Sequence, residues 1–307
     1  MEFLRFLESI RTPFFDAVFG FITRFGEETI GLVILCAIFW CINKRVAYGI
    51  GIAYFLSGLT VQGMKISFRI DRPWVIDPNF SPVPSAVEHA TGYSFPSGHT
   101  QSAAALFGSL GFQIKNIPLG TICFLIVFLV AFSRMYLGVH TLLDVSVSLV
   151  ISLLLIMFTE RFLFIRKVNK KRELIIALVM ILYAAIAAAI AAALYSRGKI
   201  EQGYLSDCLK AAGAGFGYAI GMFIERVYIG FSVTTKNKYF QIIKFIPGLA
   251  GVLIIKEGLK LLTGTGLIID MARYFLMLLW VMTFYPLIIK RFFSFTDKKE
   301  KIIEHSR

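Results

Sequence analysis

The twelve residues SRMYLGVHTLLD, 133–144, join two apolar segments and bring an arginine, a histidine and an aspartate together. The segments on either side, near 117–135 and 140–160, are each long enough to cross a bilayer, which needs about 20 mostly apolar residues. His140 and Asp144 are four residues apart, so on a helix their side chains share one face. The stretch therefore predicts a turn between two membrane helices with a histidine–carboxylate pair at its end.

Composition extends the membrane interpretation to the whole chain. Of 307 residues, 57% are hydrophobic and only 17% are charged, which is far more apolar than a soluble domain. The net charge of +13 does not indicate a nucleic-acid partner, because the basic residues lie between apolar segments rather than on one polar domain. The four cysteines lack the spacing of a zinc site or a disulfide framework. We predict an all-α, polytopic membrane protein.

Candidate membrane segments follow one another along the chain. They lie near 28–43, 46–64, 99–115, 117–135, 140–160, 174–196, 206–225, 242–263 and 271–289. A further run, Thr12–Phe25, is short and contains Asp16, which leaves open whether it crosses the bilayer or lies at the interface. Residues 1–11 lack the pattern of a cleaved secretory signal, so the first segment is expected to be retained. The prediction is nine or ten membrane helices.

The chain divides into parts at the polar stretch Arg166–Glu173. The expected parts are a catalytic core over 1–165, a helical transmembrane extension over 174–292 and a basic cytoplasmic tail over 293–307. In the extension three glycines recur every four residues, at Gly213, Gly217 and Gly221. Such a spacing favours close packing of one membrane helix against another. We expect the packing to be within the chain, with homodimerisation as the less favoured alternative; the oligomeric state stays open.

Positive charge collects on one side of the segments. Counting the segments alternately gives that side Lys44, Arg45, Lys115, the cluster between 161 and 172, Arg226, Lys236, Lys238, Lys290, Arg291 and the tail. Cytoplasmic loops are enriched in Lys and Arg, so this side is predicted to be cytoplasmic and the turn 133–144 to lie on the opposite, non-cytoplasmic side. If Thr12–Phe25 crosses, the N-terminus with Arg5 and Arg11 is cytoplasmic as well.

Two further clusters bring charge to the non-cytoplasmic side. Pro96-Ser97-Gly98-His99 opens an apolar segment, where the unpaired N–H groups of a helix N-terminus favour a phosphate-like anion. Permanent positive charge comes from Lys65, Arg72 and Arg134, and guanidinium groups suit phosphate oxygens. Asp144 can accept a proton from one nitrogen of His140, which leaves the other nitrogen free to attack. Together these residues predict a site that handles phosphate.

Three motifs, Lys65-x6-Arg72-Pro73, Pro96-Ser97-Gly98-His99 and Ser133-Arg134-x5-His140-x3-Asp144, resemble the signature of the type 2 phosphatidic acid phosphatase superfamily. That superfamily includes lipid phosphate phosphatases, bacterial undecaprenyl pyrophosphate and phosphatidylglycerophosphate phosphatases, glucose-6-phosphatase and vanadium haloperoxidases. The resemblance covers about residues 12–162, which in the superfamily form a six-helix core. It therefore implies that Thr12–Phe25 is a membrane helix and that about four more follow the core.

The resemblance also implies a role for each matched residue. His140 would attack phosphorus and form a phosphohistidine, Asp144 would orient its imidazole, and His99 would protonate the leaving group. The phosphoryl oxygens would be bound by Lys65, Arg72, Ser97, Gly98 and Arg134. Water would then release inorganic phosphate as the second substrate. No metal or other cofactor is implied.

Other polar residues on that side have two interpretations each. Tyr93 and Tyr136 are interfacial aromatics that could also line the substrate entrance. Lys256 and Lys260, near the end of a C-terminal helix, either extend to the interface or bind a second anionic group of the substrate. His89 lies outside the motifs, and we expect no catalytic role for it.

The sequence predicts a metal-independent membrane phosphatase that hydrolyses a lipid phosphomonoester or diphosphate, such as phosphatidic acid or undecaprenyl pyrophosphate. Hydrolysis of a soluble phosphate ester, as by glucose-6-phosphatase, is one alternative. Another is a transporter or scramblase that retains the phosphatase core. The intact His99, His140 and Asp144 argue against transport, because transport alone needs no nucleophile with its orienting acid.

Overall fold

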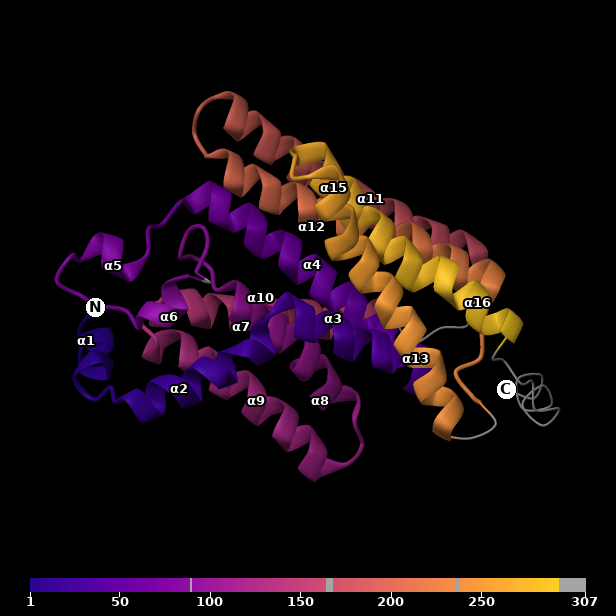
Figure 1. Ribbon diagram of the computed structural model, residues 1–307, viewed down its shortest axis with the longest axis horizontal. Coiled ribbons are helices and arrows are strands. Elements are labelled where there is room, and N and C mark those ends of the chain that lie inside the picture. The colour runs from indigo at the N-terminus through magenta and orange to yellow at the C-terminus, as the bar shows by residue number, and fades with distance from the viewer. Residues whose placement is uncertain (89, 164–167, 236–237, 293–307) are drawn as a thin grey trace.

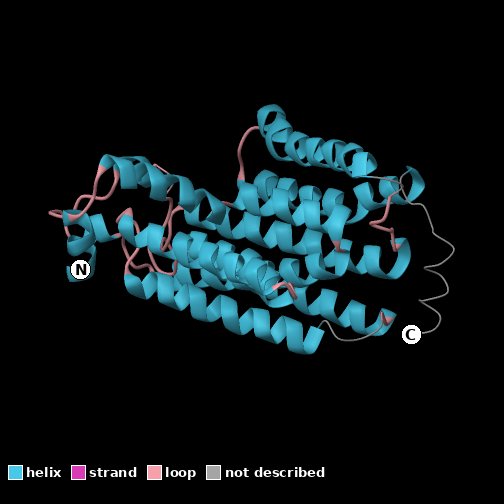
Figure 2. Ribbon diagram, turned by 90° about the horizontal axis from the view of Figure 1, so that it is seen from below, coloured by secondary structure: helices cyan, strands magenta, loops and turns pink. Residues whose placement is uncertain are grey.

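The protein is a bundle of helices with the motif loops gathered at one end. The computed structural model describes residues 1–88, 90–163, 168–235 and 238–292, and no β-strand occurs in these ranges. The long helices run side by side through an elongated body, and most of the long loops lie at the end that also holds the N-terminus (Figures 1 and 2). The predicted all-α architecture is confirmed. His89, Lys236, the tail 293–307 and residues 164–167 at the expected domain boundary lie outside the described residues.

The core half of the chain contains ten α-helices among the described residues. They are α1 (Glu2–Ser9), α2 (Pro13–Ile22), α3 (Glu28–Ala37), α4 (Lys44–Phe68), α5 (Pro73–Ile76), α6 (Pro84–Val87), α7 (Gly98–Ala103), α8 (Ser109–Gln113), α9 (Ile117–Tyr136) and α10 (Leu142–Phe158). A 3-10 turn, η1 (Thr23–Gly26), links α2 to α3, and π-helical turns extend three of the helices. These turns are η2 (Ile38–Ile42), η3 (Ala104–Gly108) and η4 (Thr159–Leu163).

The extension begins with two long helices, α11 (Lys170–Ser196) and α12 (Gln202–Ile224). It continues through α13 (Lys238–Leu253), α14 (Leu259–Thr263), α15 (Leu267–Leu279) and α16 (Tyr285–Phe292). The π-helical turns here are η5 (Glu225–Ile229), η6 (Ile254–Gly258) and η7 (Trp280–Phe284). In Figure 1 α4 lies between the extension helices α12 and α15 and the remaining core helices.

Five helical stretches in the described part of the chain are long and apolar enough to cross a bilayer. They are Lys44–Ile76, Ile117–Tyr136, Leu142–Arg161, Lys170–Ser196 and Leu267–Phe292, and the pair Pro13–Gly26 and Glu28–Ile42 makes a sixth if counted as one span. The segments expected near 99–115, 206–225 and 242–263 are helical but do not meet this criterion. This measure counts fewer candidate spans than the nine or ten membrane helices predicted from the sequence.

The segment Thr12–Phe25 does not cross by itself. Its helix α2 has ten residues, about 15 Å or half the hydrocarbon thickness, and it meets α3 at a bend of 53°. The backbone N–H of Thr12 donates to the hydroxyl of Tyr136 at 3.2 Å, which places the start of α2 beside the end of α9. Arg5 also pairs with Asp77 at 2.5 Å. The N-terminus therefore lies at the end of the motif loops, which does not agree with a separate crossing by Thr12–Phe25.

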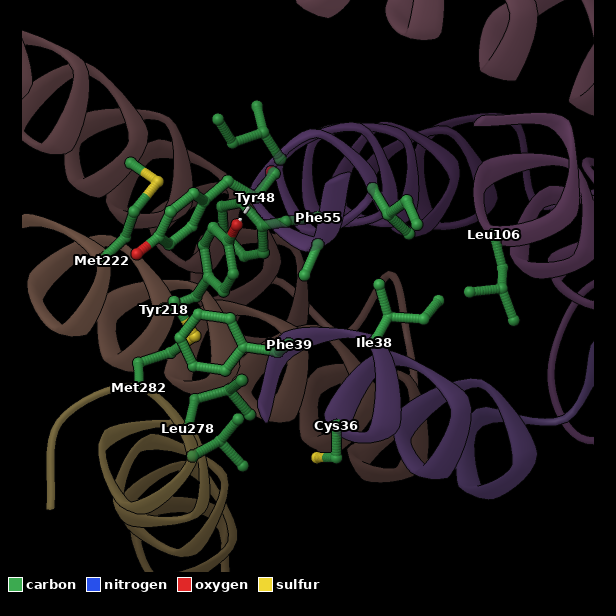
Figure 3. Packing of buried hydrophobic residues seen from close by; sticks show 14 of the residues in the cluster. Cys36, Ile38, Phe39, Tyr48, Phe55, Leu106, Tyr218, Met222, Leu278 and Met282 are labelled. Atoms are coloured by element: carbon green, nitrogen blue, oxygen red, sulfur yellow. Dashed lines mark hydrogen bonds between the residues drawn. The ribbon is translucent and has the colours of Figure 1, made fainter. Parts of the chain in front are cut away.

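The outer faces of the bundle are apolar. Among the most apolar windows, only 33% of Leu142–Arg161 and 22% of Lys170–Ser196 is buried inside the protein, and large side chains such as Leu154, Leu182 and Phe128 point outward. Exposed apolar surface on this scale requires a cover of lipid. Inside, aromatic and aliphatic residues of both halves form one core, in which Phe39 and Phe55 approach Tyr218, Leu278 and Met282 (Figure 3).

The three regularly spaced glycines of α12 pack against α15 and the π-helical turn η7 that follows it. A methyl group on Gly213 would lie 2.2 Å from the carbonyl oxygen of Met271, and one on Gly217 would lie 2.4 Å from that of Phe275. At Gly221 it would lie 2.5 Å from Cβ of Met282. The backbones approach this closely because glycine has no side chain. The predicted packing within the chain is confirmed.

This contact gives a test of stability. We expect Gly217→Ala to lower the free energy of unfolding by about 1–3 kcal/mol, since overpacking forces the two helices apart. Gly203→Ala is the matched control on the same helix, because no atom lies within 4 Å of the added methyl group. Thermal unfolding in detergent measures both. Equal midpoints for the two variants would contradict the close α12–α15 contact.

Candidate active site

The turn between α9 and α10 folds His140 back over the end of α9. The backbone N–H groups of Val139 and His140 both donate to the carbonyl oxygen of Arg134, at 3.1 and 3.2 Å. Gly138 makes the reversal with a φ of 77°, a left-handed conformation that favours glycine. His140 is left only 1% exposed, against the equally buried Arg134.

Asp144 holds the imidazole of His140 from one side. Its Oδ2 lies 3.4 Å from Nδ1 of His140 and accepts hydrogen bonds from the Thr141 N–H at 2.8 Å and the Ser94 hydroxyl at 2.5 Å. The bond from Thr141 belongs to a capping box at the start of α10. The carboxylate is therefore fixed by its own helix and by the loop before Pro96.

Arg72 contacts the opposite nitrogen of the same ring. Its Nη1 lies 2.9 Å from Nε2 of His140. A guanidinium has donors only, so Nε2 accepts this bond and carries a lone pair. The proton of a neutral ring then sits on Nδ1, which faces Asp144. The two contacts thus assign the tautomer and leave the lone pair of the ring on Nε2.

Arg72 also ties the loops of the site together. It donates to the carbonyl oxygens of Thr91, Gly92 and Val139 at 2.8–2.9 Å. At least four of its five N–H donors are engaged in this way. The sequence predicts Arg72 as a phosphate ligand, and in this structure its N–H groups bond the loop backbone and His140 instead.

Arg134 and Lys65 complete the group of buried cations. Nη1 of Arg134 donates to the Thr23 hydroxyl at 2.7 Å, while its Nε is buried and has no hydrogen-bond partner among the described residues. Lys65 donates to the carbonyl oxygen of Tyr93 at 2.9 Å. A buried donor without a partner is costly, so Arg134 is suited to receive an anionic oxygen.

The Pro96–His99 motif forms the start of α7. The Ser97 hydroxyl accepts the N–H of Thr100 at 3.4 Å and its hydroxyl at 3.0 Å, and the Ser97 N–H donates to the carbonyl oxygen of Asp144 at 3.2 Å. Ser97 is therefore the N-cap of α7 and joins α7 to α10. Gly98 and His99, which follow it, line the cavity described next.

One cavity of about 480 Å³ brings the motif residues together. Six of the eight residues predicted for catalysis and phosphate binding line it: Lys65, Arg72, Gly98, His99, Arg134 and His140. Ser97 and Asp144 do not line it but contact α7 and His140 from behind. Burial, followed by the charges of Arg72, Arg134 and Lys65, holds the pKa of His140 well below its ordinary value of 6.5. Its imidazole is therefore neutral at pH 7.

Four other predicted contacts do not line the cavity. Tyr136 is 2% exposed, and its ring packs 4.4 Å from that of Phe19. Tyr93 stacks on Tyr204 of α12, with 4.2 Å between ring centroids. Lys256 donates to the Thr29 hydroxyl at 2.9 Å and lies 3.6 Å from Glu28, and neither it nor Lys260 lines the cavity.

Sequence reasoning missed several residues of the site. Ser94 and Thr23 contact Asp144 and Arg134, but neither has a spacing that signals this. Lys210 of α12 lines the cavity and forms an ion pair with Asp207 at 3.2 Å. The two lie three residues apart in an otherwise apolar helix, and this pair of charges is the one signal that could have found Lys210.

The sequence is similar to known proteins in both halves of the chain. Residues 45–167 match the PAP2 superfamily, and residues 209–298 match the transmembrane extension of PAP2 superfamily phosphatases. A probable sphingosine-1-phosphate phosphatase of Dictyostelium discoideum is 30% identical over 170 residues, which are 50% of this chain and 40% of that protein. The chain thus spans less than half the length of that relative.

Two proteins of Bacillus subtilis (strain 168) are similar over more of their length. Phosphatidylglycerophosphatase B is 28% identical over 50% of this chain and 77% of its own length. Undecaprenyl-diphosphatase BcrC is 29% identical over 46% of this chain and 70% of its own length. Among solved structures, Aquifex aeolicus LpxE has 23% identity and a TM-score of 0.46, over 52% of this chain and 94% of that one.

The first matched region contains every motif residue from Lys65 to Asp144, and the second contains the glycine-packed helices of the extension. The chain therefore belongs to the PAP2 superfamily and carries the transmembrane extension that is found in phosphatases of that superfamily.

Proposed function

We propose that the protein hydrolyses a lipid phosphomonoester or diphosphate at the non-cytoplasmic face of a membrane, through a phosphohistidine intermediate. The observation that carries this proposal is the lone pair on Nε2 of His140. It lies in a cavity lined by the cations Lys65, Arg72 and Arg134. A neutral nucleophile surrounded by buried positive charge suits an anionic phosphoryl group.

The reaction would proceed in two displacements. The phosphoryl group takes the place of the guanidinium contact at Nε2, and Nε2 then forms a bond to phosphorus as the bond to the leaving oxygen breaks. His99 gives that oxygen a proton, while Asp144 stabilises the positive charge that develops on His140. Water attacks phosphorus in the second step, His99 accepts its proton, and inorganic phosphate leaves with the electron pair of the P–N bond returned to Nε2.

The lining of the cavity favours a lipid over a soluble ester. Away from the cations it is bounded by apolar side chains, including Leu32, Phe55 and Leu106. A sugar phosphate would leave these side chains in contact with water, whereas a hydrocarbon chain would cover them. The names of the relatives point the same way, since they refer to sphingosine 1-phosphate, phosphatidylglycerophosphate and undecaprenyl diphosphate.

The distribution of charge supports the non-cytoplasmic placement. Helix ends away from the site carry Lys44, Arg45, Lys115, Lys170, Lys171, Arg172, Arg226 and Lys290. Cytoplasmic ends of membrane helices collect Lys and Arg in this way. The site lies at the other end, where a substrate in the outer leaflet would present its phosphate.

Replacing the nucleophile is the most direct test. We expect His140→Ala to reduce phosphate release by about a thousandfold or more and to abolish a phosphoenzyme trapped with radiolabelled substrate. Release of inorganic phosphate by purified protein in detergent measures the rate. Lys260→Ala, outside the cavity, should keep the wild-type rate. Near-normal hydrolysis by folded His140→Ala would show that the nucleophile is another group.

The low pKa of His140 gives a second test. Because only the neutral imidazole attacks, kcat/KM should fall with decreasing pH only below pH 6.5. Removing a neighbouring cation raises the pKa of His140, so Lys65→Met should move this acid limb to higher pH. Ionisation of the substrate is the same for both proteins and does not affect the comparison. An acid limb that stays in place, or moves to lower pH, would contradict the assignment.

Lys210 provides a test of diphosphate binding. It lines the cavity with the three site cations, so we expect it to contact the second phosphate of a diphosphate. Lys210→Ala should then lower kcat/KM about tenfold for a prenyl diphosphate and much less for the prenyl monophosphate. Lys256→Ala is the matched control, since that lysine is held by Glu28 and Thr29. Equal losses on both substrates would exclude this role of Lys210.

A further inference from the structure

We propose that the transmembrane extension forms half of the substrate site: α12 and α15 are one wall of a slot that receives a single hydrocarbon chain of the lipid, with Tyr218 as its floor. This inference rests on the proposed function, because it names what binds in the part of the same cavity that extends from the cations toward Tyr218. It assigns the extension a part in choosing the substrate rather than only in anchoring the core.

The slot follows α4 away from the phosphate site. The residues of α4 that line it recur every three or four positions, and they include Gly51, Tyr54, Gly58, Gln62 and Lys65. This spacing is one face of a helix. From Lys65 to Gly51 the face is 14 residues long, or about 21 Å. The cavity is therefore far longer than a phosphate group and points into the membrane part of the bundle.

The wall opposite α4 belongs to the extension. On α12 the lining residues follow the same helical spacing, from Asp207 and Lys210 through Ala211 and Ala214 to Tyr218. α12 packs directly against α4. Alanines on α12 and Gly58 on α4 leave the space between these two helices open. On α15, Met277 and Leu278 close the side of the slot.

The wall changes character along its length. Beside the cations it carries Asp207 and Lys210, which form an ion pair with each other. From Ala211 onward its residues on α12 are apolar, apart from the hydroxyl of Tyr218. From the core, Leu35 and Leu106 face the same space, together with Tyr54, Gln101 and Ser102, whose polar groups are hydrogen-bonded within the core. A polar end joined to a long apolar end matches the two parts of a lipid phosphate.

Tyr218 closes the apolar end. Its side chain is 4% exposed, and its hydroxyl donates to the carbonyl oxygen of Tyr48 at 2.9 Å. A methyl group on Gly51 would lie 2.4 Å from that hydroxyl oxygen, so glycine is required where the tyrosine crosses α4. Its ring also stacks with that of Phe55, at 6.5 Å between centroids. Figure 3 shows Tyr218 with Tyr48, Phe55 and Met222 in one packed group. Because these contacts fix the side chain of Tyr218, it limits the length of the hydrocarbon chain that the slot can hold.

The test uses a series of substrates that differ in the chain alone. Butyl, octyl, dodecyl and hexadecyl phosphate are compared with purified full-length protein, at a fixed mole fraction in detergent micelles. We expect kcat/KM to rise along the series while methylene groups fill the slot, and to stop rising or fall once the chain reaches Tyr218. Equal values for all four phosphates would overturn the slot but leave the proposed function standing. Absence of hydrolysis of every member, and of lipid phosphates, would instead refute the proposed function.

Two variants locate the slot on the extension. Ala214→Leu should lower kcat/KM for dodecyl and hexadecyl phosphate about tenfold, because it fills the space that the chain occupies, and should leave butyl phosphate within about twofold of wild type. Ala189→Leu, on an exposed face of α11, is the control and should behave as wild type. Equal losses on short and long substrates, or no loss on long ones, would overturn the proposal.

The second variant opens the floor. Tyr218→Ala should shift the preferred substrate toward longer chains without changing the rate for butyl phosphate by more than about twofold. Size-exclusion profiles establish that each variant is folded. If Tyr218→Ala does not fold, the wild-type chain series and Ala214→Leu still decide the question. A folded Tyr218→Ala protein with an unchanged chain preference would show that Tyr218 is not the floor.

Discussion

The contact between the guanidinium of Arg72 and Nε2 of His140 is the constraint on which the site depends. One side chain assigns the tautomer of the proposed nucleophile and also donates hydrogen bonds to three carbonyl oxygens of two loops. It can do so because it is 6% exposed, so water does not compete for its donors. Any change that moved Arg72 would therefore disturb the nucleophile and the loop around it together.

The same burial explains why the site suits an anion. Lys65, Arg72 and Arg134 are all less than a tenth exposed, and Asp144 is already bonded to Ser94 and Thr141. Buried charge is costly unless it is paired. The carbonyl and hydroxyl partners of these cations are neutral, and one buried donor of Arg134 has no partner in the described structure. Glu27 and Asp207 also line the cavity, but neither forms an ion pair with these three cations in the described part of the chain, so a phosphoryl group would add negative charge beside them.

Site residues that lie close together in the sequence could be predicted. Those that distant helices bring to the site could not. His140 and Asp144 share a helix face, and the glycines of α12 repeat at helical spacing, so both follow from local geometry. Thr23 and Lys210 reach the site from other helices. The charges of Asp207 and Lys210 mark the second of these positions as unusual, but the sequence does not indicate where either helix packs. The bend between α2 and α3 could not be predicted for a related reason. Two apolar runs that follow each other in the sequence do not reveal whether they form one bent membrane span or two separate ones.

The stacked rings of Tyr93 and Tyr204 join the two halves of the protein at the loop that positions Lys65 and Asp144. Tyr93 supplies the carbonyl oxygen that holds Lys65, and it precedes Ser94, which holds Asp144. Its ring rests on α12. The loop that aligns a cation and a carboxylate of the core thus takes its support from the extension. A core truncated at the end of α10 would keep all three sequence motifs. It would lose α12, against which the loop with Tyr93 and Ser94 packs.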